Sequence, residues 1–122
     1  MALDARSVLA ADGAGCLAAA AAMAASDSLA ALVLPSRTAR APVAASLGAT
    51  AVMLLSTAAR TEPTSHGLTR AAAVNLGWVA ACCLSIGRSP RRWGTVLIAG
   101  TALVDGLAAA LQWRLGRSAA AS

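Results

Sequence analysis

Long apolar segments separated by short polar links dominate the chain. No residue carries charge between Pro42 and Ala59 or between Ala71 and Gly87, and Asp105 is the one charge between Trp93 and Trp113. A helix that crosses a membrane needs about 20 mostly apolar residues, and each of these segments has a suitable length. The pattern predicts membrane-spanning helices over about 41–59, 68–87 and 93–113, the last one bracketed by tryptophans, which favour membrane interfaces.

The N-terminal third predicts a fourth spanning helix over about 7–25 and a short helix after it. One helix over 7–34 would be about 42 Å long, which exceeds a hydrocarbon core of about 30 Å. The polar run Ser26-Asp27-Ser28 interrupts this segment. We therefore expect a break at Ser26, which would cap a short helix over about 27–34 that ends at Pro35. This helix would lie at the membrane interface or re-enter the bundle.

These elements predict an all-α fold, a single membrane domain over 1–122 formed by a four-transmembrane-helix bundle with a short interfacial helix between helices 1 and 2. Pro42 suits the first turn of its helix, where a missing N–H is not needed. The residues 88–92 predict a tight hairpin turn, and the loop over 60–67 holds the one histidine, His66. After Leu115 we expect a frayed polar tail.

Two alternatives to this arrangement remain open. Alanine-rich sequence also forms soluble helices, but an amphipathic soluble helix needs a charged face, which these segments lack. The N-terminal segment also resembles a secretory signal peptide, with Ala22-Met23-Ala24 as a small-x-small cleavage site. Asp4 and Asp12 argue against cleavage, because they place charge before and inside the apolar region.

Composition supports the membrane interpretation and excludes several other classes. Hydrophobic residues make up 58% of the chain and charged residues 12%, against about 45–50% and roughly 25% in soluble domains. Long apolar segments argue against disorder, and three irregularly spaced cysteines do not form a disulfide framework. Ten scattered arginines with few aromatic residues do not indicate nucleic-acid binding. The expected partner is the lipid bilayer, and the expected location is a membrane that the chain crosses several times.

The arginines do not decide the orientation. With four spans, both termini share a side with the middle loop, and five arginines fall on each side of the membrane. The positive-inside rule therefore gives no bias. We expect both termini in the cytoplasm, as the default for an even number of spans, and insertion in both orientations is the alternative.

Ionisable and amide side chains inside the spans are the candidate functional residues, because such groups are costly in a membrane. Helical spacing joins these groups and the hydroxyl and thiol side chains into one weakly polar stripe per helix, so that four stripes would face each other in a bundle. The stripes consist of Asp12 and Cys16; Ser46, Thr50, Met53 and Thr57; Asn75, Trp78, Cys82 and Ser85; and Thr101, Asp105 and Gln112. Estimated depths put Asp12, Asn75 and Asp105 in the half of the bundle nearer the termini. The candidate intramembrane polar cluster consists of Asp12, Arg70, Asn75, Thr101, Asp105 and Gln112.

This cluster has two interpretations. In the functional one, two desolvated carboxylates exchange a proton for a cationic substrate, since burial disfavours the charged form of a carboxyl group. In the structural one, carboxylate, amide and hydroxyl groups hydrogen-bond across helices and set their register. Such bonds contribute about 0.6 kcal/mol each on average in membranes. The structural interpretation is the favoured one.

The cysteines offer a remote metal-binding hypothesis. Vicinal thiols bind soft metals such as Cu(I) or Hg(II), and Cys82 and Cys83 are adjacent, with Cys16 in the first helix. Buried cysteine more often behaves as a small apolar residue. We expect no metal site and no cofactor. The sequence shows no zinc spacing, phosphate loop, nucleophile elbow or dinucleotide fingerprint, so we expect no enzymatic activity.

Two resemblances follow from these residues. The order of segments, with Asp12 in the first helix and Trp78 in the third, resembles the small multidrug resistance transporters. That resemblance implies an antiparallel dimer with a first-helix carboxylate, although that family has a deeper glutamate and an aromatic box that this chain lacks. The run from Leu29 to Pro35 and the Asn75-x-x-Trp78 pair resemble small four-helix membrane proteins of GC-rich bacteria, in particular actinobacteria. This second resemblance implies a fold and a location only.

The sequence therefore predicts a non-enzymatic integral membrane protein, a structural or accessory component of the bacterial inner membrane. Its expected partners are further copies of the chain or subunits of a membrane complex. The alternative is a small proton-coupled exporter of cationic compounds that acts as a dimer, with Asp12 and Asp105 as the exchanging carboxylates. A soft-metal carrier is the remote alternative.

Overall fold

The computed structural model describes residues 3–60 and 62–122, and it is built from five helices in chain order. They are α1 (Ala5–Ala25), α2 (Asp27–Val33), α3 (Arg37–Ala58), α4 (Ser65–Ser85) and α5 (Arg92–Ala121). All helices except α2 are long and apolar enough to cross a membrane. The predicted all-helical bundle with four such helices is confirmed.

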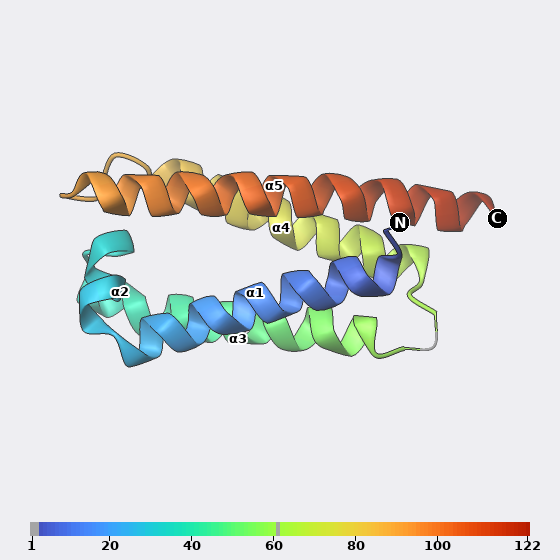
Figure 1. Ribbon diagram of the computed structural model, residues 1–122, viewed down its shortest axis with the longest axis horizontal. Coiled ribbons are helices and arrows are strands. Elements are labelled where there is room, and N and C mark those ends of the chain that lie inside the picture. Colours follow the sequence, from blue (N-terminus) through green and yellow to red (C-terminus); the bar gives the residue numbers. More distant parts are fainter. Residues whose placement is uncertain (1–2, 61) are drawn as a thin grey trace.

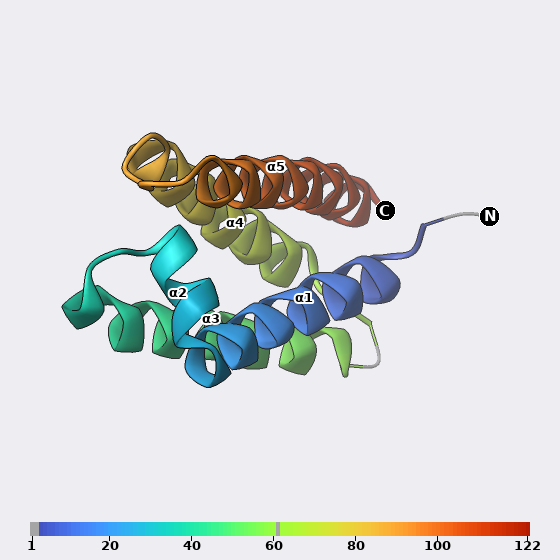
Figure 2. The same ribbon diagram turned by 60° about the vertical axis from the view of Figure 1, so that its left-hand side comes forward.

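The four long helices form two antiparallel pairs. The most extensive contacts join α1 to α3 and α4 to α5, whereas α3 and α4 touch only briefly. Both termini and the link between α3 and α4 lie at one end of the bundle (Figure 1). The short helix α2 lies at the other end, between the two pairs, where it contacts α1 and α5 (Figure 2). The predicted arrangement, with both termini beside the middle link, is therefore observed.

Polar side chains cap three of the helices where they begin. The Asp4 carboxylate accepts hydrogen bonds from the Ser7 backbone N–H at 2.7 Å and from the Ser7 hydroxyl at 3.1 Å. These bonds, the backbone one foremost, hold the pKa of the Asp4 carboxyl below its usual range. Ser26 accepts from the backbone N–H of Leu29, as predicted, and so ends α1 and begins α2. Thr64 caps α4 in the same way, through the N–H of Gly67.

Two predicted helix limits are wrong. The third helix begins at Arg37, so Pro42 lies inside it and not in its first turn. The missing N–H of Pro42 removes one hydrogen bond of the helix, and the five residues before it are nevertheless helical. The expected frayed tail is also wrong, because α5 continues to Ala121. Its last turns are rich in alanine, which has the highest helix propensity.

The core is small and lies where α1, α3 and α4 meet. It consists of Leu9, Cys16, Ala51, Leu54, Ala58, Leu68 and Ala71. Much apolar surface instead faces outward, above all on α5, where Leu103 is 76% exposed and Trp113 is 50% exposed. Soluble monomers rarely expose large contiguous apolar patches, so this surface suits a lipid environment.

Candidate functional site

Three polar side chains from three helices form a hydrogen-bonded group, called here the amide–carboxylate cluster: Asp12 of α1, Asn75 of α4 and Gln112 of α5. Asn75 Nδ2 donates to Asp12 Oδ2 at 2.6 Å and to Gln112 Oε1 at 2.9 Å. Gln112 Nε2 also donates to Asp12 Oδ2, at 2.6 Å. Each residue therefore contacts the other two, and the triangle ties α1 to the pair formed by α4 and α5.

Burial and close helix packing hold these three side chains together. Asn75 and Gln112 are completely buried, and Asp12 is half-buried. Close packing of α4 on α5 helps, because a side chain at Gly116 would press on Leu68 and on the Ser65 carbonyl oxygen. Polar groups that are buried away from water remain costly unless they are hydrogen-bonded, so each partner in the cluster stabilises the placement of the others.

Asp12 enters the cluster as an acceptor. One oxygen of its carboxyl group, Oδ2, receives an N–H donor from each of the two amides. Within the described residues one buried side-chain atom of the cluster is left without a partner, the Asn75 oxygen Oδ1. Asn75 Nδ2 already donates both of its hydrogens, so the two acceptors, on Asp12 and Gln112, determine how the amide is oriented.

The other three residues of the predicted cluster lie outside the triangle. Asp105 is half-buried on α5, and it makes no hydrogen bond to another described residue. Arg70 is exposed on α4 and does not contact the triangle. Thr101 is exposed, and its hydroxyl donates to the Leu97 carbonyl of its own helix at 2.8 Å.

The predicted hydroxyl stripes act mostly within single helices. Five stripe hydroxyls donate to the carbonyl four residues earlier on their own helix, namely those of Ser46, Thr50, Thr57, Ser85 and Thr101. One of them also receives a bond from another helix, because Trp78 Nε1 donates to Thr50 Oγ1 at 3.2 Å. This bond connects α4 to α3, whose direct contact is slight.

The cysteines do not gather into one site. Cys16 is buried, Cys82 is half-buried and Cys83 is exposed, and all three are free thiols. Among the described residues, no group of three or more histidine, cysteine, aspartate or glutamate side chains is placed to hold a metal ion.

Two contacts between distant segments were not predicted from the sequence. An Arg6 guanidinium nitrogen donates to the Arg60 carbonyl oxygen at 2.8 Å, at the end that holds the termini. At the opposite end the Ser89 hydroxyl donates to the Leu32 carbonyl oxygen at 2.7 Å and fastens α2 to the link between α4 and α5. Both acceptors are backbone oxygens, which every residue carries, so no sequence signal marks them.

Comparison with other proteins adds no family assignment. No protein-family model, curated protein or solved structure matches the chain. The function must therefore be argued from the site alone.

Proposed function

We propose that this chain is a non-enzymatic integral membrane protein, a structural or accessory component of the bacterial inner membrane, whose amide–carboxylate cluster fastens the bundle. Four long apolar helices and the outward apolar surface of α5 support the membrane location. The short helix α2 would lie at the interface. The observation that carries the structural role is that three hydrogen bonds link Asp12, Asn75 and Gln112 to one another, so that the Asp12 carboxyl group is bonded to amides of its own chain.

The cavities support this interpretation. An exchanging carboxylate needs space for its substrate beside it. Two of the cavities that the described residues form are not lined by the cluster or by Asp105, and Thr101 is the predicted site residue that lines one of them. The carboxylate of Asp12 faces amide groups of its own chain.

The first test asks whether the cluster stabilises the fold. Asp12→Ala leaves two buried donors without an acceptor, and we expect it to lower the free energy of unfolding by about 1–3 kcal/mol. Asp12→Asn keeps a carbonyl oxygen that accepts both bonds without the charge. We therefore expect its loss in the free energy of unfolding to be less than half of the loss in Asp12→Ala. Unfolding of the purified protein in mixed micelles of mild detergent and dodecyl sulfate, followed by circular dichroism, measures both variants.

Asp105→Asn provides the matched control, because Asp105 is a half-buried carboxylate outside the triangle. The structural role predicts stability near wild type for this variant. Unchanged unfolding of Asp12→Ala would contradict the proposal. Release of protons on addition of a cationic compound, lost in Asp105→Asn, would instead favour the dimeric proton-coupled exporter.

A further inference from the structure

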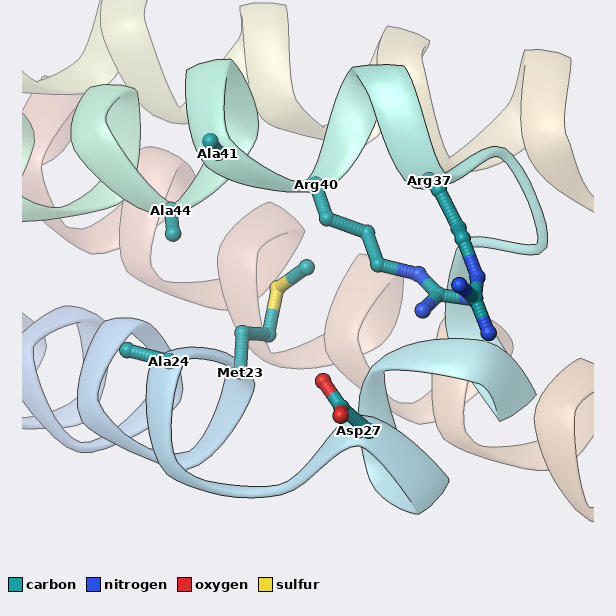
Figure 3. Close-up of a pocket in the computed structure, with 7 residues that line it drawn as sticks. All are labelled: Met23, Ala24, Asp27, Arg37, Arg40, Ala41 and Ala44. Carbon is teal, nitrogen blue, oxygen red and sulfur yellow. The ribbon is translucent and has the colours of Figure 1, made fainter.

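A cavity of about 480 Å³ opens at the end of the bundle where α2 lies, beside the link from α2 to α3. Met23 of α1 and alanines of α1 and α3 form its apolar wall. Its charged lining consists of Arg37 and Arg40, from the first turn of α3, and Asp27, from the first turn of α2 (Figure 3). The cavity thus combines two cations, one anion and an apolar side.

The two arginines line the same cavity. They are three residues apart and so share one face of the helix, and both side chains are among those that surround the opening in Figure 3. Arg40 is fixed by hydrogen bonds from Nε to the Leu34 carbonyl at 2.9 Å and from an Nη atom to the Pro35 carbonyl at 3.3 Å. Two guanidinium groups that line one cavity repel each other, and an anion bound between them would offset that repulsion.

Asp27 does not supply that anion. Its carboxylate points toward the same opening (Figure 3), but within the described residues it forms no salt bridge with either arginine. The three charges therefore face the opening separately, with space for a ligand between them. A ligand that carries both a negative and a positive group would complement all three.

A second cavity, of about 300 Å³, is also lined by Met23. It lies between the two helix pairs, and its lining is mostly apolar, with Leu29 and Val33 of α2, Leu47 of α3 and Ile98 of α5 among its residues. Met23 lines both cavities, so the charged opening and the apolar interior adjoin. This combination suits an amphipathic molecule with a charged head and a hydrocarbon chain.

From this geometry we infer that the chain binds one phospholipid that carries a primary amine, such as phosphatidylethanolamine. The lipid phosphate binds the guanidinium groups of Arg37 and Arg40, which match a phosphate with paired donors. The lipid ammonium binds the Asp27 carboxylate, and one acyl chain passes Met23 into the apolar cavity. The inference rests on the membrane location proposed above.

Other headgroups satisfy the cavity less well. A phosphatidylglycerol headgroup has no cation, so it would leave the Asp27 carboxylate unpaired beside a phosphate. A phosphatidylcholine headgroup has a cation, but its quaternary nitrogen carries no N–H to donate to Asp27. The carboxylate is thus the group that selects the amine, and the arginines are the groups that bind the phosphate.

Native mass spectrometry of the full chain tests this inference. The protein is reconstituted into nanodiscs with equal amounts of the three phospholipids, and the lipid that stays bound after release is identified. We expect one phosphatidylethanolamine, favoured about tenfold over each of the others, as the loss of one charge-assisted hydrogen bond would give. Arg37→Gln should lose binding of all three lipids. Arg37 is chosen instead of Arg40 because Arg40 also donates hydrogen bonds to backbone carbonyls of the α2–α3 link.

Two further variants separate the roles. Asp27→Asn should keep lipid binding but lose the preference for the amine, and Arg88→Gln, which removes an exposed arginine of the α4–α5 link outside the cavity, should behave as wild type. Equal retention of the three lipids, or wild-type behaviour of Arg37→Gln, overturns the inference. Preference for phosphatidylglycerol that Asp27→Asn leaves unchanged overturns the amine assignment. Failure to enter the nanodisc overturns the membrane location and the lipid site together, whereas entry without preference overturns the lipid site alone.

Discussion

At the scale of single residues, Asn75 is the centre of the polar network. It donates to both other members of the cluster, and it is completely buried. A hydrophobic residue here would remove both bonds at once and leave Gln112 Oε1 without its donor. A substitution at Asn75 therefore removes two of the three bonds of the cluster, as many as a substitution at Asp12, although the carboxylate is the more conspicuous residue in the sequence.

Sequence reasoning found the members of this network but not their pairing. Asp12, Asn75 and Gln112 stand out because polar groups are rare in such apolar segments. Helical spacing assigns each residue to a face, but it does not give the rotation or the height of one helix against another. For that reason Asp105 and Thr101 were grouped with Gln112 on one stripe, whereas only Gln112 enters the network.

The bond from Trp78 to Thr50 gives a prediction at this scale. Thr50→Val keeps the shape of the side chain and removes the acceptor, so Trp78 Nε1 loses its partner. We expect a loss of about 0.6 kcal/mol, and not more than about 1.7 kcal/mol, in the free energy of unfolding. Trp78 fluorescence should also shift, measured in a background where the exposed Trp93 and Trp113 are replaced by phenylalanine.

Thr101→Val is the control for this measurement. The Thr101 hydroxyl bonds only to a carbonyl of its own helix, so its removal should leave both stability and fluorescence near those of the background. Equal effects of the two substitutions would mean that the bond between α3 and α4 contributes nothing beyond the loss of a hydroxyl group.

At the scale of the helices, the ends of a helix can be predicted from the sequence where a specific side chain caps them. The break at Ser26 was predicted because serine caps helices, and the structure has that hydrogen bond. The end of α5 was not predicted, because hydropathy measures the length of the apolar segment and not that of the helix. With 30 residues, α5 is about 45 Å long and exceeds a hydrocarbon core of about 30 Å.

The packing of α1 on α3 gives a prediction at this scale. A Cβ atom at Gly13 would lie 2.8 Å from Leu55 Cγ and 3.2 Å from Leu54 Cβ, so the Leu55 side chain or the two helices would have to shift. We expect Gly13→Ala to lower the free energy of unfolding by about 1–3 kcal/mol, the usual cost of overpacking. The measurement is unfolding in mixed micelles followed by circular dichroism.

Gly15→Ala is the matched control on the same helix. Nothing lies within 4 Å of its added Cβ, and alanine has the higher helix propensity, so stability should be unchanged or slightly increased. If Gly13→Ala were as stable as Gly15→Ala, the close approach of α1 and α3 would not occur in the folded protein.

At the scale of the whole molecule, the structure divides into two helix pairs joined by few groups. They are connected by the apolar core where α1, α3 and α4 meet, by the amide–carboxylate cluster, by the bond from Trp78 to Thr50 and by the contacts of α2. The overall order of helices could be predicted, because hydropathy and short links leave few alternatives. The division into pairs could not, because alanine-rich faces fit many neighbours almost equally well.

The distribution of arginine over the two ends gives the last prediction. Arg6, Arg60, Arg70, Arg114 and Arg117 belong to the end that holds the termini, and Arg37, Arg40, Arg88, Arg91 and Arg92 to the other end. Orientation follows an excess of positive charge on the cytoplasmic side, and this protein has no excess. A single charge should therefore decide the orientation, which it would not do in a protein with a strong bias.

Reporters fused to either terminus, one active only in the cytoplasm and one only in the periplasm, measure this. Both termini should report the same side, because four spans return the chain to its starting side. Arg88→Gln leaves the excess at the termini and should move them toward the cytoplasm, whereas Arg117→Gln should move them toward the periplasm. Opposite readings from the two termini would contradict the four-span arrangement. Shifts in the same direction from both variants would instead show that a feature other than the arginine balance sets the orientation.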